Sequence, residues 1–133
     1  MAMIEPGNTA VIEFTTDEET TAIALGSGDL PVLGTPKVVA LVEEASVAAL
    51  VGLLADAETT VGSHIDVDHL APTAIGGTVV VTATVVVVKG RRVDFEATVT
   101  EGETLVAKAN HVRYVVNRES FLESLSRQPE TGD

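Results

Sequence analysis

The sequence predicts an α+β domain in which a curved antiparallel sheet packs against one long helix. Residues 36–55 are apolar almost all round, which is typical of a buried helix. Several segments rich in β-branched residues indicate strands, and the last three are joined by very short turns. Turns that short require antiparallel pairing. The length suits one domain, so we expect residues 1–133 to form a single unit.

Composition narrows the possible functions. Hydrophobic residues make up 45% of the chain and aromatic residues only 3%, so the core must consist of Val, Ala, Leu and Ile. The net charge of −12 argues against a nucleic-acid partner or an anionic membrane, because either would need a basic face. The chain has no cysteine, which excludes a disulfide, a thiolate nucleophile and a cysteine zinc site.

No targeting or membrane segment is recognisable in the sequence. Residues 1–6 have neither a basic start nor an apolar run, so they do not resemble a signal peptide. The longest apolar stretch, 45–55, is too short to span a bilayer. We therefore expect a cytoplasmic protein without a membrane partner.

The N-terminal part is expected to contain a strand, a short helix and a loop. Residues 9–15 alternate loosely between apolar and polar side chains, which indicates a strand. Residues 17–25 begin with Asp17 and two glutamates, which is typical of a short helix with an N-terminal cap. Residues 26–34 contain three glycines and one proline and so predict a loop. This loop is either a plain connector or a lid over a substrate.

The central helix is expected over about residues 36–55. Pro36 suits the first position of a helix, and Thr35 before it is suited to act as the N-cap. A second strand is expected over 60–70, followed by a turn-rich connection over 71–77.

The C-terminal half is expected to form three long strands and a short helix. Residues 78–88 are rich in valine, and we expect both faces of this strand to be covered in its second half. Residues 93–100 alternate cleanly, 104–116 form the last strand, and Asn117 caps a short amphipathic helix. The polar tail from Arg127 is expected to fray. About five antiparallel strands wrapped around one helix make the hot-dog fold.

Two carboxylates interrupt the apolar central helix. Glu43 and Glu44 lie about 100° apart around the helix axis, so they cannot both point inward. Glu44 shares a side with Lys37 and is expected to be the exposed one. A buried charge is costly without a partner, so Glu43 is either a structural carboxylate bound to backbone groups or a group kept for chemistry.

The second strand offers an imidazole to pair with Glu43. Alternation places Ile65, Val67 and His69 on one face, which their apolar character predicts to be inward. A lone inward histidine is more often a hydrogen-bonded core residue than a catalyst. An inward carboxylate and an inward imidazole on facing elements are a ready acid/base pair, so we expect Glu43 and His69 to meet.

The other face of this strand carries His64, Asp66 and Asp68. Two carboxylates and an imidazole in a row suit a divalent metal ion. An open, flat row rarely closes a coordination shell, so a solvated strand face is the stronger interpretation. We expect no metal site.

Two groups of basic residues are candidate anion sites. His111 and Arg113 share a strand face with two alanines, whose small size leaves space beside the arginine, although an ordinary surface ion pair is the alternative. Arg91 and Arg92 form a basic cluster with Lys89 at a hairpin turn. This cluster suits phosphates, but a solvated hairpin tip is the commoner case.

The order and spacing of Thr35, Glu43, Gly62 and His69 resemble those of the fluoroacetyl-coenzyme A thioesterase family of the hot-dog superfamily. The resemblance covers about residues 7–125. It includes Gly34 before the threonine, the turn that begins with Ala71-Pro72, the Gly90-Arg91-Arg92 turn and the His111-x-Arg113 strand. The second half also resembles the broader phenylacetate-type thioesterases, from HIDVDH at 64–69 to TLVAKA at 104–109.

The resemblance implies an acyl-coenzyme A thioesterase whose catalytic set is Thr35, Glu43 and His69. Glu43 would attack the thioester carbonyl or activate water, His69 would act as acid and base, and Thr35 would orient the glutamate or the substrate. The backbone near Gly62 would hold the thioester oxygen, and Arg113 would lie near the acyl pocket. Coenzyme A would enter as part of the substrate, with no separate cofactor, and Arg91 and Arg92 are the candidates to bind its phosphates.

The resemblance also implies a homodimer with sites at the subunit interface, and it leaves open whether dimers pair into tetramers. In a straight helix, Thr35 lies about 12 Å from Glu43 along the axis. The two residues therefore share one site only if the chain departs from the helix near Thr35 or if different subunits contribute them.

One segment departs from the family pattern. The fluoroacetyl-specific enzyme has aromatic residues in the lid before its threonine, whereas residues 26–34 contain none. We therefore expect a small acyl group without naming it. The alternative is a hot-dog protein that binds an acyl-coenzyme A or another small ligand without hydrolysing it, and the intact Thr–Glu–His set argues against this alternative.

Overall fold

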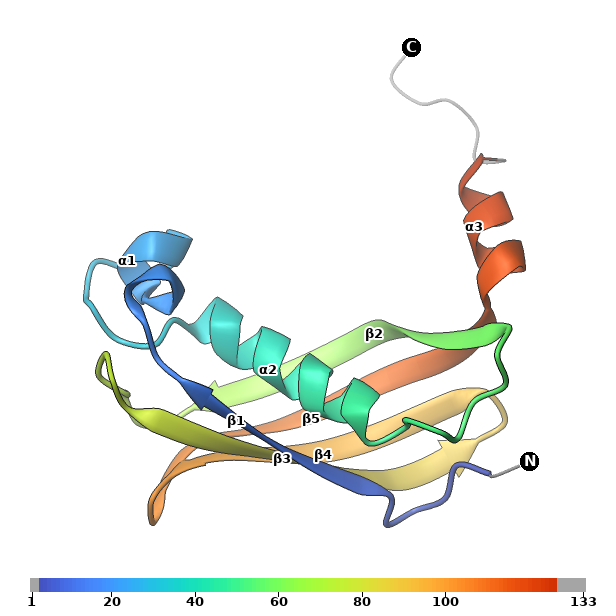
Figure 1. Ribbon diagram of the computed structural model, residues 1–133, viewed down its shortest axis with the longest axis horizontal. Helices are drawn as coiled ribbons and strands as arrows, with labels where there is room; N and C mark the ends of the chain where they lie inside the picture. The colour runs from blue at the N-terminus through green and yellow to red at the C-terminus, as the bar shows by residue number, and fades with distance from the viewer. Residues whose placement is uncertain (1–2, 127–133) are drawn as a thin grey trace.

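A five-stranded antiparallel sheet curves around one long helix in the computed structural model of the chain, which describes residues 3–126 (Figure 1). The strands are β1 (Thr9–Thr15), β2 (Glu58–His69), β3 (Thr78–Lys89), β4 (Arg92–Glu101) and β5 (Thr104–Asn117), in the spatial order β1-β3-β4-β5-β2. The helices are η1 (Glu18–Thr20), α1 (Ala22–Leu25), α2 (Thr35–Ala48) and α3 (Arg118–Ser126). The predicted α+β hot-dog fold is confirmed.

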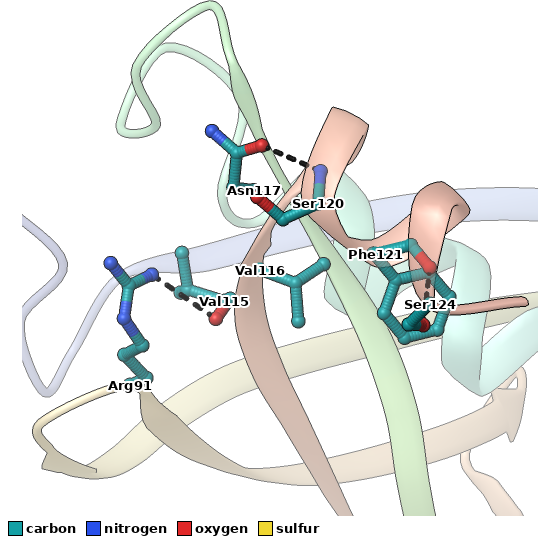
Figure 2. Close-up of a pocket in the computed structure, with 7 residues that line it drawn as sticks. All are labelled: Arg91, Val115, Val116, Asn117, Ser120, Phe121 and Ser124. Carbon is teal, nitrogen blue, oxygen red and sulfur yellow. Dashed lines mark hydrogen bonds between the residues drawn. The ribbon is translucent and has the colours of Figure 1, made fainter. Parts of the chain in front are cut away.

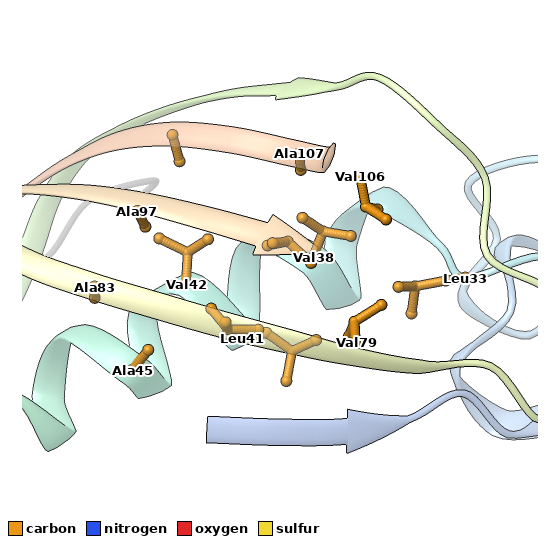
Figure 3. Close-up of a cluster of buried hydrophobic side chains, with 13 residues drawn as sticks. Leu33, Val38, Leu41, Val42, Ala45, Val79, Ala83, Ala97, Val106 and Ala107 are labelled. Carbon is orange, nitrogen blue, oxygen red and sulfur yellow. The ribbon is translucent and has the colours of Figure 1, made fainter. Parts of the chain in front are cut away.

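The core lies between α2 and the concave face of the sheet (Figure 3). Val38, Leu41, Val42 and Ala45 of α2 are at most 1% exposed. They contact inward valines and alanines of β3, β4 and β5, as the clean alternation of β4 predicted. Burying a valine or leucine side chain contributes about 1.5–3 kcal/mol, so this contact fixes α2 against the sheet.

One side of α2 stays uncovered, although its apolar sequence predicted burial all round. Ala40, Glu44 and Val47 are exposed, and Val51 just beyond the helix is 78% exposed. These four residues recur every three or four positions and so form one stripe along the helix. We refer to them as the exposed α2 stripe.

The ends of α2 also differ from the prediction. Gly34 is the N-cap and Thr35 is the first helical residue, so Thr35 does not cap the helix. The helix ends at Ala48 rather than near residue 55, because the chain turns there and Gly52 adopts a positive φ of 82°. The expected helix over 17–25 is divided into η1 and α1, with Thr21 capping α1 through a hydrogen bond from the Ala24 amide.

The strand and C-terminal predictions are confirmed in part. Asn117 caps α3 by accepting a hydrogen bond from the Ser120 amide at 2.9 Å. The valine run of β3 is not covered on both faces, because Val86 and Val87 are 36% and 41% exposed where a bulge interrupts the pairing with β4. The tail from Arg127 lies outside the described residues. No helix within residues 3–126 is long and apolar enough to cross a membrane.

Candidate active site

Glu43 points from the middle of α2 toward β2 and β5. Its Oε2 lies 3.6 Å from Nη1 of Arg113, and its side chain remains 43% exposed. Glu44, one residue further, is exposed to solvent as expected. The carboxylate of Glu43 is therefore held by a charged partner and is still accessible to a ligand.

Gly62 of β2 leaves a notch beside this carboxylate. A Cβ at Gly62 would lie 3.0 Å from Glu43 Oε2, 3.2 Å from His111 Cε1 and 3.3 Å from Arg113 Nη1. A side chain there would crowd all three groups. The absence of one lets the main chain of β2 lie directly against the Glu43 carboxylate.

A β-bulge at Ser63 turns Gly62 toward the helix. The pairing of β2 with β5 slips between Gly62 and His64, so one extra residue separates the two halves of the strand. Ile65, Val67 and His69 are half-buried on the inner face, as predicted. Strict alternation from His69 would place Gly62 on the outer face, and the bulge reverses this.

Arg113 is buried and nearly every donor it has is occupied. It is 8% exposed. Its Nε donates to Thr60 Oγ1 at 2.8 Å and its Nη2 donates to the Thr60 carbonyl at 3.0 Å. Burial lowers the pKa of Arg113, and the nearby Glu43 carboxylate opposes this shift. The alternative of an ordinary surface ion pair is therefore wrong for Arg113.

His111 completes the contacts of Arg113 from the same strand. It is 2% exposed and stacks on Phe95. Its Nδ1 lies 2.7 Å from the His64 carbonyl, which can only accept, so Nδ1 carries the proton. Its Nε2 then accepts from Arg113 Nη1 at 3.2 Å. Burial lowers the pKa of His111, a backbone hydrogen bond to His64 partly offsets this, and the Arg113 charge lowers it further.

Thr35 and His69 form a second group at the start of α2. Thr35 Oγ1 lies 2.8 Å from His69 Nδ1. The Nε2 atom of His69 is buried, and no hydrogen-bond partner for it is found in the described part of the chain. Burial lowers the pKa of His69, which favours the neutral imidazole that a general base requires.

Glu43 and the Thr35–His69 pair do not meet within one chain. No hydrogen bond or ion pair joins Glu43 to His69 among residues 3–126, so facing inward does not bring them together within one chain. Glu43 lies against Gly62, and seven residues of extended strand place His69 about 20 Å further along β2. Thr35 lies about 12 Å from Glu43 along α2.

The two arginines of the hairpin turn differ in position. Arg92 lies on the convex face with its guanidinium bound to both carboxylate oxygens of Asp94 at 2.8 and 3.2 Å, which raises the pKa of Arg92. The structure therefore does not bring Arg92 to the concave face that carries Glu43. Arg91 is 65% exposed, lies 3.6 Å from Glu58 and donates to the Val115 carbonyl at 3.3 Å.

The outer face of β2 has the composition of a solvated surface. His64 Nε2 lies 3.6 Å from Asp66 Oδ2, and both side chains are more than 60% exposed. Among residues 3–126 there is no group of three or more histidine, aspartate or glutamate side chains placed to share a metal ion.

Sequence reasoning missed Thr60 and the bulge at Ser63. Thr60 carries no catalytic signature in the sequence, and its role becomes visible only from its two contacts with Arg113. The Gly62-Ser63 pair is a weak indication of a bulge, because glycine inside a strand often marks one.

Comparison with known proteins identifies the family to which this chain belongs. The fluoroacetyl-CoA-specific thioesterase family matches residues 16–119. The fluoroacetyl-CoA thioesterase of Streptantibioticus cattleyicolor is 36% identical over 90 residues, which are 68% of this chain and 65% of that protein. The chain belongs to the fluoroacetyl-CoA-specific thioesterase family. The match thus spans slightly less than two thirds of the curated relative.

Solved structures agree with the family assignment. A phenylalanine-to-alanine variant of the fluoroacetyl-CoA-specific thioesterase superposes with a TM-score of 0.89 at 27% identity, covering 97% of this chain and 100% of that one. A threonine-to-alanine variant of the same enzyme, in complex with fluoroacetate, gives 0.86 at 28% identity, with 95% and 100% coverage. A thioesterase superfamily member from Thermus thermophilus gives 0.85 at 25% identity, with 96% and 93% coverage.

Proposed function

We propose that this protein is a thioesterase that hydrolyses a small acyl-coenzyme A. The observation that carries the proposal is the notch at Gly62, where an accessible glutamate faces exposed main chain. Family membership supports the reaction class, since the curated relative is named a fluoroacetyl-CoA thioesterase. The absence of aromatic residues in 26–34 is the reason to leave the acyl group unnamed.

Glu43 is the group that reacts in this proposal. Either its carboxylate attacks the thioester carbonyl, or it removes a proton from the attacking water. Arg113 holds the carboxylate through Oε2, the oxygen that lies nearest to Gly62. Main-chain N–H groups near Gly62 stabilise the negative charge that develops on the thioester oxygen.

Thr35 and His69 supply the proton transfers. The attacking water gives up a proton and the thiolate leaving group takes one up when the C–S bond breaks, so an imidazole is suited to carry the proton from the first to the second. Thr35 fixes the ring of His69 through Nδ1. The buried Nε2 is the atom left for the reaction.

A second copy of the chain brings the two groups together. β2 is an edge strand of 12 residues whose outer edge is not paired by any described strand. An open edge of this length pairs readily with another strand. Two β2 strands related by a twofold axis near residues 65 and 66 would set Gly62 of one subunit opposite the partner's His69. Each homodimer would then contain two shared sites.

The exposed α2 stripe supports the same interface. Val47 and Val51 line a groove together with Thr59 and Thr60 of β2, so the stripe and the β2 edge form one continuous surface. Exposed apolar residues next to an open strand edge are typical of a surface covered by a partner. Pairing of dimers into tetramers, and the cytoplasmic location, remain predictions from the sequence.

A thiol-release assay tests the proposal. Short, branched and aromatic acyl-coenzyme A esters are incubated with the protein, and free thiol is measured. We expect at least one small acyl ester to be hydrolysed, with Glu43→Gln and His69→Ala each lowering kcat by about a hundredfold or more. Activity that survives both changes would disprove the site. Tight binding of the esters without turnover would favour the non-catalytic alternative.

A further inference from the structure

Cations are scarce in this protein, and several of the described ones are already engaged. The chain has eight Lys and Arg residues and 20 Asp and Glu residues, which gives a net charge of −12. Arg113 is buried, Arg92 is bound to Asp94, and the ammonium of Lys37 lies 4.6 Å from the centroid of the Phe14 ring. Coenzyme A carries several phosphate charges, so its site must lie where accessible cations remain.

Accessible cationic side chains lie together at one end of the sheet. Arg91 follows the end of β3 at Lys89, and its carbonyl accepts from the Val115 amide at 2.8 Å. Arg118, at the start of α3, donates its amide to the Ala57 carbonyl at 2.9 Å. Glu58, next to Ala57, lies 3.6 Å from Arg91. These contacts draw the starts of β2, β4 and α3 to the same end of the sheet.

A groove at this cationic end reaches Thr60, next to the candidate active site. It has a volume of about 300 Å³ and lies between the end of α2 and the start of β2. Thr60, which binds Arg113, lines one part of it, and Arg118 lines another. Val47, Val51 and Leu54 add apolar walls. The groove therefore runs from Thr60, beside the Arg113–Glu43 pair, to the exposed Arg118.

Two carboxylates also line this groove, and one of them is in loose contact with the exposed Arg91 guanidinium. Glu58 lies 3.6 Å from Arg91 through Oε2 and accepts from the Ala55 amide at 3.2 Å through Oε1. Asp56 is the other. An apolar arm with amide groups fits such walls better than a phosphate does, so phosphates belong at the arginines and not inside the groove.

A second cavity opens beside Arg91 at the base of α3 (Figure 2). Its volume is about 370 Å³, and Val116 and the ring of Phe121 form apolar walls. Phe121 is 38% exposed, so its ring is accessible to a flat aromatic partner. Stacking of a nucleobase on such a ring is favourable for every base.

We propose that coenzyme A lies along these two cavities, with its pantetheine arm in the groove, its phosphates at Arg118 and Arg91, and its adenine against Phe121. This assignment rests on the proposed function, because the thioester end must reach Glu43. Arg118 and Phe121 thereby become binding residues for the nucleotide half of the substrate.

Steady-state kinetics with two thioesters of the same acyl group test this site. One is the coenzyme A ester, and the other is the N-acetylcysteamine ester, which lacks the phosphates and the adenine. We expect Arg118→Gln and Arg91→Gln each to raise KM for the coenzyme A ester about tenfold with little change in kcat. Phe121→Ala should raise the same KM, and none of the three should change KM for the truncated ester.

Lys108→Gln is the matched control, since it removes one exposed positive charge from the convex side of the sheet. If Arg118→Gln, Phe121→Ala and Lys108→Gln all have the same KM for the coenzyme A ester, the proposed coenzyme A site is wrong. Hydrolysis of the ester in that case would still support the proposed thioesterase function. Calorimetric titration with free coenzyme A tests the coenzyme A site separately from the thioesterase function. Binding that weakens in Arg118→Gln without any hydrolysis would uphold the site and overturn the thioesterase, and no binding would overturn the site.

Discussion

The contacts of Arg113 form a buried polar network in which each donor has an assigned acceptor. Thr60 accepts from Nε and Nη2, and His111 accepts from Nη1. A buried network of this kind is stabilising only when its members are satisfied, because an unpaired buried polar group costs about 1–3 kcal/mol. The network fixes the Arg113 charge next to Glu43 and so fixes the carboxylate.

Protonation of His111 should weaken this network. A second proton would place an N–H and a positive charge against Arg113, with Glu43 and His64 as the other titratable groups nearby. The pKa of His111 is lowered in the folded chain, so its contribution to stability is full above 6.5 and is lost as pH falls through the folded pKa. We expect the free energy of unfolding to fall as pH drops below 6.5, by up to about 1.4 kcal/mol per pH unit for this one group.

Urea denaturation between pH 5.5 and 7.5 measures this dependence. His111→Gln cannot titrate in this range, so its stability should change less with pH than that of the wild type. Equal slopes for the two proteins would show that His111 stays neutral, or charges at no cost, across the range.

Gly62 should be sensitive to the addition of one methyl group. A Cβ would lie within 3.3 Å of Glu43, His111 and Arg113, and the two buried neighbours have little freedom to move. We expect Gly62→Ala to lower kcat/KM for the best ester at least about tenfold, because a carboxylate displaced from its productive geometry loses rate steeply. Thermal unfolding is the control, and a folded variant with unchanged kcat/KM would show that the notch is not used.

At the scale of elements, one residue of β2 decides which groups face the helix. The Ser63 bulge lets Gly62 and Thr60 share the inner side with Ile65, Val67 and His69. Periodicity predicted the helix, the five strands and the inward face of residues 65–69 well, because apolar spacing reports burial directly. It could not predict the bulge, since no apolar residue marks the shift.

The separation of Glu43 from His69 along β2 also lay beyond the sequence, whereas the separation of Thr35 from Glu43 along α2 followed from helix geometry. Facing elements can be inferred from apolar faces, but the register between a helix and a strand depends on the whole packed structure. Thr35 and His69 face each other, whereas Glu43 faces Gly62, because α2 and β2 run in opposite directions. The exposure of the α2 stripe follows from its position on the side of α2 that no described element covers, which hydrophobicity cannot reveal.

The exposed α2 stripe yields a test at the same scale. Val47 is 46% exposed in the single chain, so Val47→Glu should leave the fold intact but place a charge in the proposed interface. We expect the variant to be monomeric by light scattering and to lose nearly all thioesterase activity. Val11→Glu, on the outer face of edge strand β1 and 59% exposed, is the matched control and should stay dimeric and active. A dimeric, active Val47→Glu would rule out this interface.

For the whole molecule, the proposed mechanism requires two subunits for one reaction. A single chain holds Glu43 at one place and the Thr35–His69 pair at another, about 12 Å away along the helix and about 20 Å along the strand. A twofold dimer through β2 brings opposite ends of two strands together. Dimerisation would thus assemble the catalytic set and not merely stabilise it.

Mixed dimers test this claim most directly. Glu43→Gln and His69→Ala chains are each inactive in the proposed mechanism, and they are co-expressed with different affinity tags in equal amounts. If each site takes Glu43 from one subunit and His69 from the other, half of the sites in every mixed dimer are intact. Random pairing then restores about a quarter of the wild-type kcat per site, and purified mixed dimers restore about half. Mixed dimers that remain as inactive as the single variants would contradict a site shared between subunits.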